Sequence, residues 1–142
     1  IRADTAFVLT NLLEGVVKHG TAASAASLNW PLAGKTGTVD DNTDAWFVGF
    51  DPNITVGVWL GNDEKKPIGY NETGTTAALP MWIDFMKAYI DLYGNRENPP
   101  TFDSPGNIVF MAVDRLTGEP ASGDSDAVVQ EAFISGTQPI KQ

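Results

Sequence analysis

Apolar residues recur at helical spacing in the first part of the chain, over residues 4–18. One stripe of the predicted helix is formed by Leu9, Leu12, Leu13, Val16 and Val17. Asp4 stands where an N-cap is expected, and Gly20 is suited to end the helix. The stripe therefore predicts a helix that packs against the core of a domain.

A second helix is predicted over residues 76–93, with Gly94 as its stop. Pro80 falls near the first turn of this helix, where a proline is least harmful. The apolar face of the helix is predicted to consist of Ala78, Met81, Trp82, Phe85 and Tyr89.

Three strands are predicted between the helices, over residues 32–39, 45–50 and 54–61. Their connections are short and rich in Asp, Asn and Pro, so consecutive strands should be antiparallel. The second strand is apolar on both faces, and such a sheet needs helices on both sides. We therefore predict an α+β fold, an α/β/α sandwich whose antiparallel sheet is flanked by helices. Because the chain holds too few helices for both layers, we expect it to be part of a larger domain.

The pair Pro99-Pro100 marks a predicted boundary, with one domain segment over residues 1–98 and a tail over residues 99–142. The best element of the tail runs from Ile108 to Val113 and is followed by turn residues at 116–118. A small β-hairpin is therefore predicted in the tail.

Composition narrows the classes of function. The 142 residues are 42% hydrophobic and 19% charged, which is enough for one domain with a core. The net charge of −9 argues against nucleic-acid binding. With no cysteine and one histidine, we expect no disulfide, no metal site and no cofactor. No apolar run approaches the length of a membrane span, so any anchor is expected outside this chain.

The first predicted strand carries Gly34-Lys35-Thr36-Gly37-Thr38. This pentapeptide places one cation, two hydroxyls and a glycine on an extended segment, which suits a peptide-like ligand that bears a carboxylate. A phosphate-binding P-loop would need a glycine where Asn29 stands, so that interpretation fails. A surface hairpin without a binding role is the remaining alternative if the tripeptide Lys-Thr-Gly is considered alone.

Longer stretches give the pentapeptide a context. The runs 33–38, 44–50 and 58–63 resemble the transpeptidase domain of class A penicillin-binding proteins. Residues 14–17 and 20–22 are similar to the helix and loop that precede the Lys-Thr-Gly strand in that family. Residues 73–82 and 132–139 are similar to its final helix and tail. The resemblance covers nearly the whole chain in the correct order. We expect Asp44, Trp46 and Trp59 to belong to the scaffold rather than to take part in the chemistry.

Two motifs that the family needs are not found in their expected form. Serine acyltransferases of this superfamily use Ser-x-x-Lys, Ser-x-Asn and Lys-Thr-Gly, and no serine here is followed by a lysine three residues later. Ser27-Leu28-Asn29 fits Ser-x-Asn but lies too close to Lys35, so we interpret it as a chance match. The resemblance therefore implies the C-terminal half of a transpeptidase domain plus a small β tail. Such a chain, without nucleophile or glycosyltransferase domain, is expected to be inactive alone.

The resemblance implies a role for each residue of the motif. Lys35 would have a catalytic and a binding role, since it would polarise the serine hydroxyls opposite and attract the terminal carboxylate of a D-Ala-D-Ala peptide. The hydroxyls of Thr36 and Thr38 would bind that carboxylate or its counterpart on a β-lactam. Gly37 would let the substrate backbone approach closely, and the Thr38 N–H would contribute to an oxyanion hole.

The same resemblance implies the partners and the location of the protein. Its partners would be peptidoglycan stem peptides, β-lactams and the N-terminal half of the same domain. Its location would be outside the cytoplasm, in the periplasm or on the outer face of the membrane. A serine β-lactamase or a DD-carboxypeptidase is an alternative from the same superfamily, although the tail after residue 99 disfavours both. A non-catalytic module that binds peptides at a sheet edge is the alternative from another class.

Overall fold

The computed structural model describes residues 1–70, 72–122 and 127–140. Contacts divide the chain into two compact units. One unit is Leu13–Phe102, and the other combines Ile1–Leu12 with the described part of Asp103–Gln142. The first helix, α1 (Ala3–His19), contributes residues to both units.

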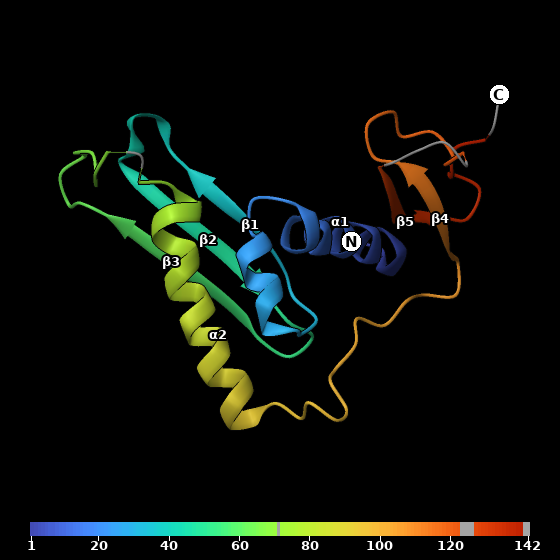
Figure 1. Ribbon diagram of the computed structural model, residues 1–142, viewed down its shortest axis with the longest axis horizontal. Helices are drawn as coiled ribbons and strands as arrows, with labels where there is room; N and C mark the ends of the chain where they lie inside the picture. Colours follow the sequence, from blue (N-terminus) through green and yellow to red (C-terminus); the bar gives the residue numbers. More distant parts are fainter. Residues whose placement is uncertain (71, 123–126, 141–142) are drawn as a thin grey trace. The chain divides into compact units, whose positions relative to one another are not determined.

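The larger unit is built on a three-stranded antiparallel sheet in the order β1-β2-β3 (Figure 1). Its strands are β1 (Ala33–Thr38), β2 (Asp44–Phe50) and β3 (Thr55–Gly61), close to the predicted ranges. The turn from β2 to β3 is held by the buried carboxylate of Asp51. This carboxylate accepts the backbone N–H groups of Asn53 (2.7 Å) and Ile54 (2.8 Å) and the indole N–H of Trp30 (2.9 Å). The mixture of helices and antiparallel sheet confirms the predicted α+β class.

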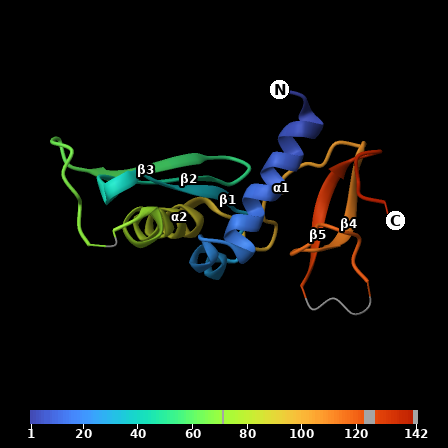
Figure 2. The same ribbon diagram turned by 90° about the horizontal axis from the view of Figure 1, so that it is seen from above.

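One face of the sheet is covered by the helix α2 (Leu79–Tyr93), which follows a single π-helical turn, η3 (Gly74–Ala78) (Figure 2). Pro80 lies in the first turn of α2, as predicted. Trp82 anchors the helix, because its ring packs 4.9 Å from that of Phe47 and its N–H donates to the Val56 carbonyl. Among the described residues, the largest fully buried side chains are Trp82, Phe47, Leu79, Met86 and Ile90.

The predicted apolar faces of both helices need correction. On α2 the buried residues are Leu79, Trp82, Met86 and Ile90, whereas Met81 and Phe85 are about half exposed. On α1 the stripe is buried at Val17, but Leu9 and Leu12 are also about half exposed. Both helices carry large apolar residues on more than one face, so the spacing of apolar residues alone does not show which face is buried.

The opposite face of the sheet carries exposed aromatic and aliphatic side chains. Trp46 and Trp59 are directly paired across β2 and β3, and each exposes more than 40% of its surface, as does Val48. Lys35 and Gly37 belong to the same face, because they pair with Val48 and Trp46. The prediction that β2 is apolar on both faces is therefore confirmed.

The smaller unit contains the strands β4 (Ile108–Asp114) and β5 (Val128–Ile134), which pair antiparallel. The predicted tight turn is present, since Gly118 has a positive φ of 73° and Val113 bridges Pro120. The main partner of β4, however, is β5, which lies further along the chain. The predicted small β tail is therefore confirmed, with a pairing of β4 and β5 that was not predicted.

The first turns of α1 pack on this tail sheet. Phe7 meets Phe110 edge-to-face, with ring centroids 6.1 Å apart. Asn11 accepts the Ala132 N–H at 2.9 Å, although in the sequence it only interrupts an apolar run. Asp4, predicted as an N-cap, lies inside the helix and is buried, and it accepts the side-chain amide of Asn107 at 2.7 Å. The division predicted between residues 98 and 99 placed all of α1 with the sheet, whereas Ile1–Leu12 is grouped with the tail.

Candidate active site

The Lys-Thr-Gly motif lies on β1, at the edge of the sheet (Figure 1). Within the described ranges, β1 pairs only with β2, so its other edge does not belong to a ladder. An unpaired strand edge is a template for an extended peptide, because its N–H and C=O groups point outward.

The register of β1 shows which backbone groups point outward. The Val39 N–H donates to the Asp44 carbonyl at 3.2 Å, so this pair belongs to the hydrogen-bonded set of the antiparallel ladder. Because the two kinds of pair alternate, Gly37 and Lys35 also direct their backbone groups toward β2. The N–H and C=O groups of Thr38 and Thr36 then point to the free edge.

The Lys35 ammonium lies at this free edge. Its Nζ donates to the Thr36 carbonyl at 3.0 Å and to Thr36 Oγ1 at 3.3 Å. Thr36 Oγ1 lies 3.3 Å from a second hydroxyl, that of Thr21, in the turn after α1. The edge thus brings one cation and the Thr21 hydroxyl together at Thr36.

Thr38 has a different environment. Its hydroxyl accepts the N–H of Gly74 at 3.2 Å, which joins β1 to the start of η3. Among the interactions that the structure describes, none joins the Thr38 side chain to Lys35 or Thr36. The predicted site residues are therefore brought together only in part: Lys35 and Thr36 are in contact, whereas Thr38 contributes an outward N–H.

Glycine at position 37 has a structural reason in this sheet. A Cβ built on Gly37 would lie 3.2 Å from Trp46 Cβ, closer than most carbon atoms pack. Gly74 is more restricted, since a Cβ there would meet the Trp46 carbonyl and lie 2.8 Å from the Gly37 carbonyl. Backbone thus packs on backbone behind the motif, and this fixes the position of η3 against β1 and β2.

Thr21 and Gly74 are the contacts that sequence reasoning missed. Both lie in stretches that resemble the family, but neither was given a role. Their proximity to the motif depends on tertiary packing, which spacing along the chain does not show. Asp44 and Trp59, placed in the scaffold, are joined by a hydrogen bond of 2.7 Å from the indole N–H to the carboxylate.

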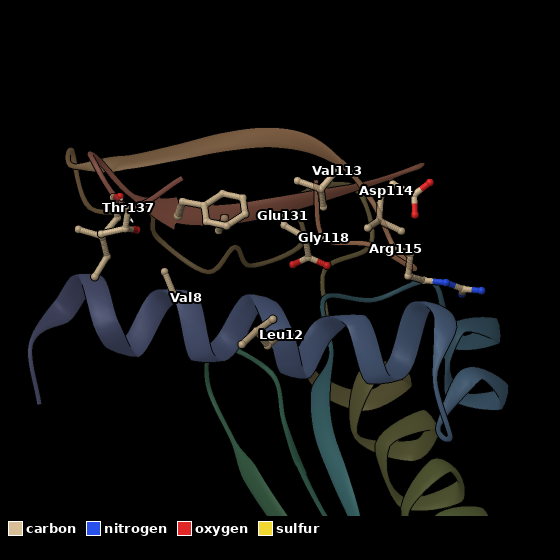
Figure 3. A pocket seen from close by; sticks show the side chains of 12 residues that line it. Val8, Leu12, Val113, Asp114, Arg115, Gly118, Glu131 and Thr137 are labelled. Carbon is tan, nitrogen blue, oxygen red and sulfur yellow. Dashed lines mark hydrogen bonds between the residues drawn. The ribbon is translucent and has the colours of Figure 1, made fainter. Parts of the chain in front are cut away.

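The cavity drawn in Figure 3 lies elsewhere, in the smaller unit. It measures about 400 Å³ and is bordered by Val8 and Leu12 of α1 and by residues of the tail such as Phe133 and Glu131. It contains none of the predicted site residues. In the part of the chain that the structure describes, no cluster of three or more His, Cys, Asp or Glu side chains could hold a metal ion. None of the described helices combines the length and the apolar character of a membrane span.

Comparison with models of known protein families assigns the chain to one of them. The family model for the penicillin-binding protein transpeptidase domain matches residues 1–80, more than half of the chain. The chain belongs to this transpeptidase family. The matched range includes the whole motif on β1 and both of its unpredicted neighbours.

Its relatives include three bacterial proteins named penicillin-binding protein 1A. The protein from Aquifex aeolicus is 40% identical over 136 residues, or 93% of this chain. Those from Rickettsia bellii and Pseudomonas aeruginosa are 44% and 36% identical, over 89% and 98% of the chain. The chain spans 15–18% of the length of these relatives.

A solved structure supports the same assignment. The crystal structure of penicillin-binding protein 1A from Haemophilus influenzae matches the whole chain with a TM-score of 0.83 at 27% identity, and the match covers 22% of that chain. The predicted resemblance to class A penicillin-binding proteins and the transpeptidase-like fold are therefore confirmed.

Proposed function

We propose that this chain supplies the substrate-binding edge of a peptidoglycan DD-transpeptidase. The observation that carries the proposal is the free edge of β1, where the Lys35 ammonium lies beside the carbonyl and the hydroxyl of Thr36. An extended donor peptide ending in D-Ala-D-Ala would pair with this edge, and its terminal carboxylate would bind near Lys35. A β-lactam would take the same place with its own carboxylate.

The reaction needs a serine from outside these residues, since no serine here is followed by a lysine three positions later. The serine oxygen would attack the carbonyl carbon of the penultimate D-Ala. The serine proton would leave with the amine of the terminal D-Ala. An acceptor amine would then attack the ester carbon, and a proton of this amine would return to the serine oxygen as the ester bond breaks. In both steps the outward N–H of Thr38 would stabilise the oxyanion, a contribution of about 10²- to 10³-fold in rate.

The partners follow from the same proposal. Stem peptides and β-lactams would bind at β1, and the remainder of the domain would cover the face that exposes Trp46 and Trp59. The whole protein would act outside the cytoplasm, held by an anchor that lies elsewhere in its sequence. Residues 1–98 would belong to the transpeptidase domain, and residues 99–142 would form its tail. The relatives named above favour a synthase over a β-lactamase or a carboxypeptidase.

Labelling with a fluorescent penicillin tests the proposal in the full-length protein. Lys35→Ala should lower the second-order acylation rate about 10- to 100-fold, the size of one charge-assisted hydrogen bond. Lys18→Ala is the matched control, because Lys18 lies on the surface of α1, where its ammonium is paired with Glu14 at 3.3 Å. Equal labelling of wild type and Lys35→Ala would contradict the proposal, as would labelling of the 142-residue chain alone.

A further inference from the structure

Among the described residues, Thr21 is the one residue outside β1 whose side chain is in hydrogen-bond contact with the side chain of Lys35 or Thr36. The two threonine hydroxyl oxygens are 3.3 Å apart, and either could be the donor. Thr21 itself is exposed, so its hydroxyl is open to a ligand that lies along the edge.

The turn that presents Thr21 is held on both sides. The N–H groups of Gly20 and Ala22 both donate to the Val16 carbonyl, at 3.1 and 3.2 Å. Ala22 is fully buried and belongs to the same core cluster as Val17. A side chain on Gly20 would collide with the backbone of Val16 at 2.9 Å. Thr21 is therefore placed by the end of α1 and by the core, independently of the strand that it contacts.

A count of protons shows what this contact can do. Thr36 Oγ1 has one proton and two lone pairs, and one lone pair accepts from the Lys35 ammonium, which can only donate. If Thr36 gave its proton to Thr21, it would have nothing to offer an incoming carboxylate. If Thr21 donates instead, both lone pairs of Thr36 are used and its proton is free to point outward.

From this geometry we infer that Thr21 is a positioning residue for the carboxylate of the ligand. Thr21 donates to Thr36, and this orients the Thr36 hydroxyl so that its proton is directed to a carboxylate bound at the free edge of β1. The ligand class is an anionic acyl donor, such as a peptide with a free C-terminal carboxylate or a penicillin. The inference rests on the proposed function, and it adds to the motif a residue that lies fourteen positions before Lys35.

The test compares a penicillin with its methyl ester as acylating agents of the full-length protein. For Thr21→Val, the apparent dissociation constant for the penicillin should rise about three- to tenfold, the size of one neutral hydrogen bond. The limiting acylation rate should change little, and the ester should be affected less than twofold. Thr21→Ser keeps the donor and should restore wild-type binding. Ser27→Ala is the control, because Ser27 donates only to the Ser24 carbonyl in the neighbouring turn.

A double variant distinguishes positioning from a general loss of structure. In a Thr36→Val background, Thr21→Val should have no further effect on binding of the penicillin. Equal losses for acid and ester, or losses that add in the double variant, would overturn the inference. If Lys35→Ala and Thr36→Val weaken labelling while Thr21→Val does not, only the role of Thr21 fails. If none of the three has an effect, the proposed function itself fails.

Discussion

At the scale of single residues, Gly37 satisfies two requirements at one position. The resemblance to transpeptidases explains it by the close approach of a substrate backbone. The structure adds an internal reason, the Trp46 side chain opposite, which would lie 3.2 Å from a Cβ. The motif could be found from the sequence, but this second reason could not, because it depends on the strand register that pairs Gly37 with Trp46.

Asp51 gives a prediction at the same scale. Asp51→Ala should lower the free energy of unfolding by about 1–3 kcal/mol, because the Trp30 N–H and two backbone N–H groups of the turn lose their acceptor. Asp51→Asn keeps one acceptor oxygen and should fall between. Urea unfolding followed by tryptophan fluorescence measures the difference.

Asp84→Ala is the matched control for the Asp51 substitutions. Asp84 is an exposed carboxylate on α2, and its removal should change the stability by less than about 0.5 kcal/mol. A loss for Asp51→Ala no larger than that of the control would show that the turn is held by other contacts.

At the scale of elements, the sequence predicts the sheet well and the helix faces poorly. The strand ranges and antiparallel pairing are confirmed, because short apolar runs and the Asp- and Asn-containing turns between them are local signals. The predicted buried face of α2 was wrong at Met81 and Phe85, because α2 is apolar on more than one side. The side that packs on the sheet is determined by contacts with β2 and β3, because the Trp82 ring packs on Phe47 and its N–H donates to the Val56 carbonyl.

Substitution of Trp82 tests which face of α2 is buried. Trp82→Ala should destabilise the protein by about 3–5 kcal/mol, since it empties a fully buried site and removes the indole N–H that donates to the Val56 carbonyl. Leu92→Ala is the matched substitution on the same helix, where the side chain is 74% exposed, and it should cost less than about 1 kcal/mol. Comparable losses for the two variants in chemical unfolding would contradict the assigned face.

At the scale of the whole molecule, the sequence predicts a division near Pro99-Pro100 but not the part that α1 has in both units. Asp4 and Asn107 are 103 positions apart, and Asn11 and Ala132 are 121 positions apart. Neither contact leaves a local pattern, because each requires the tail sheet to meet the first turns of α1. The same applies to the candidate site, where the motif was found from its letters and its contact with Thr21 only from the fold.

The stability of the contact between the first turns of α1 and the tail should depend on pH. Hydrogen bonds from Arg2, and then from Asn107, hold the pKa of Asp4 well below its usual value of 3.8. The ionised carboxylate therefore stabilises the fold fully above about pH 4, and this contribution is lost as the pH falls toward the lower folded pKa. Asp4→Asn should lower the thermal midpoint at pH 6, and the difference from wild type should narrow at pH 3. Circular dichroism measures both midpoints, with Asp84→Asn as the exposed control. A difference that stays constant between the two pH values would mean that the charge of Asp4 does not hold α1 on the tail sheet.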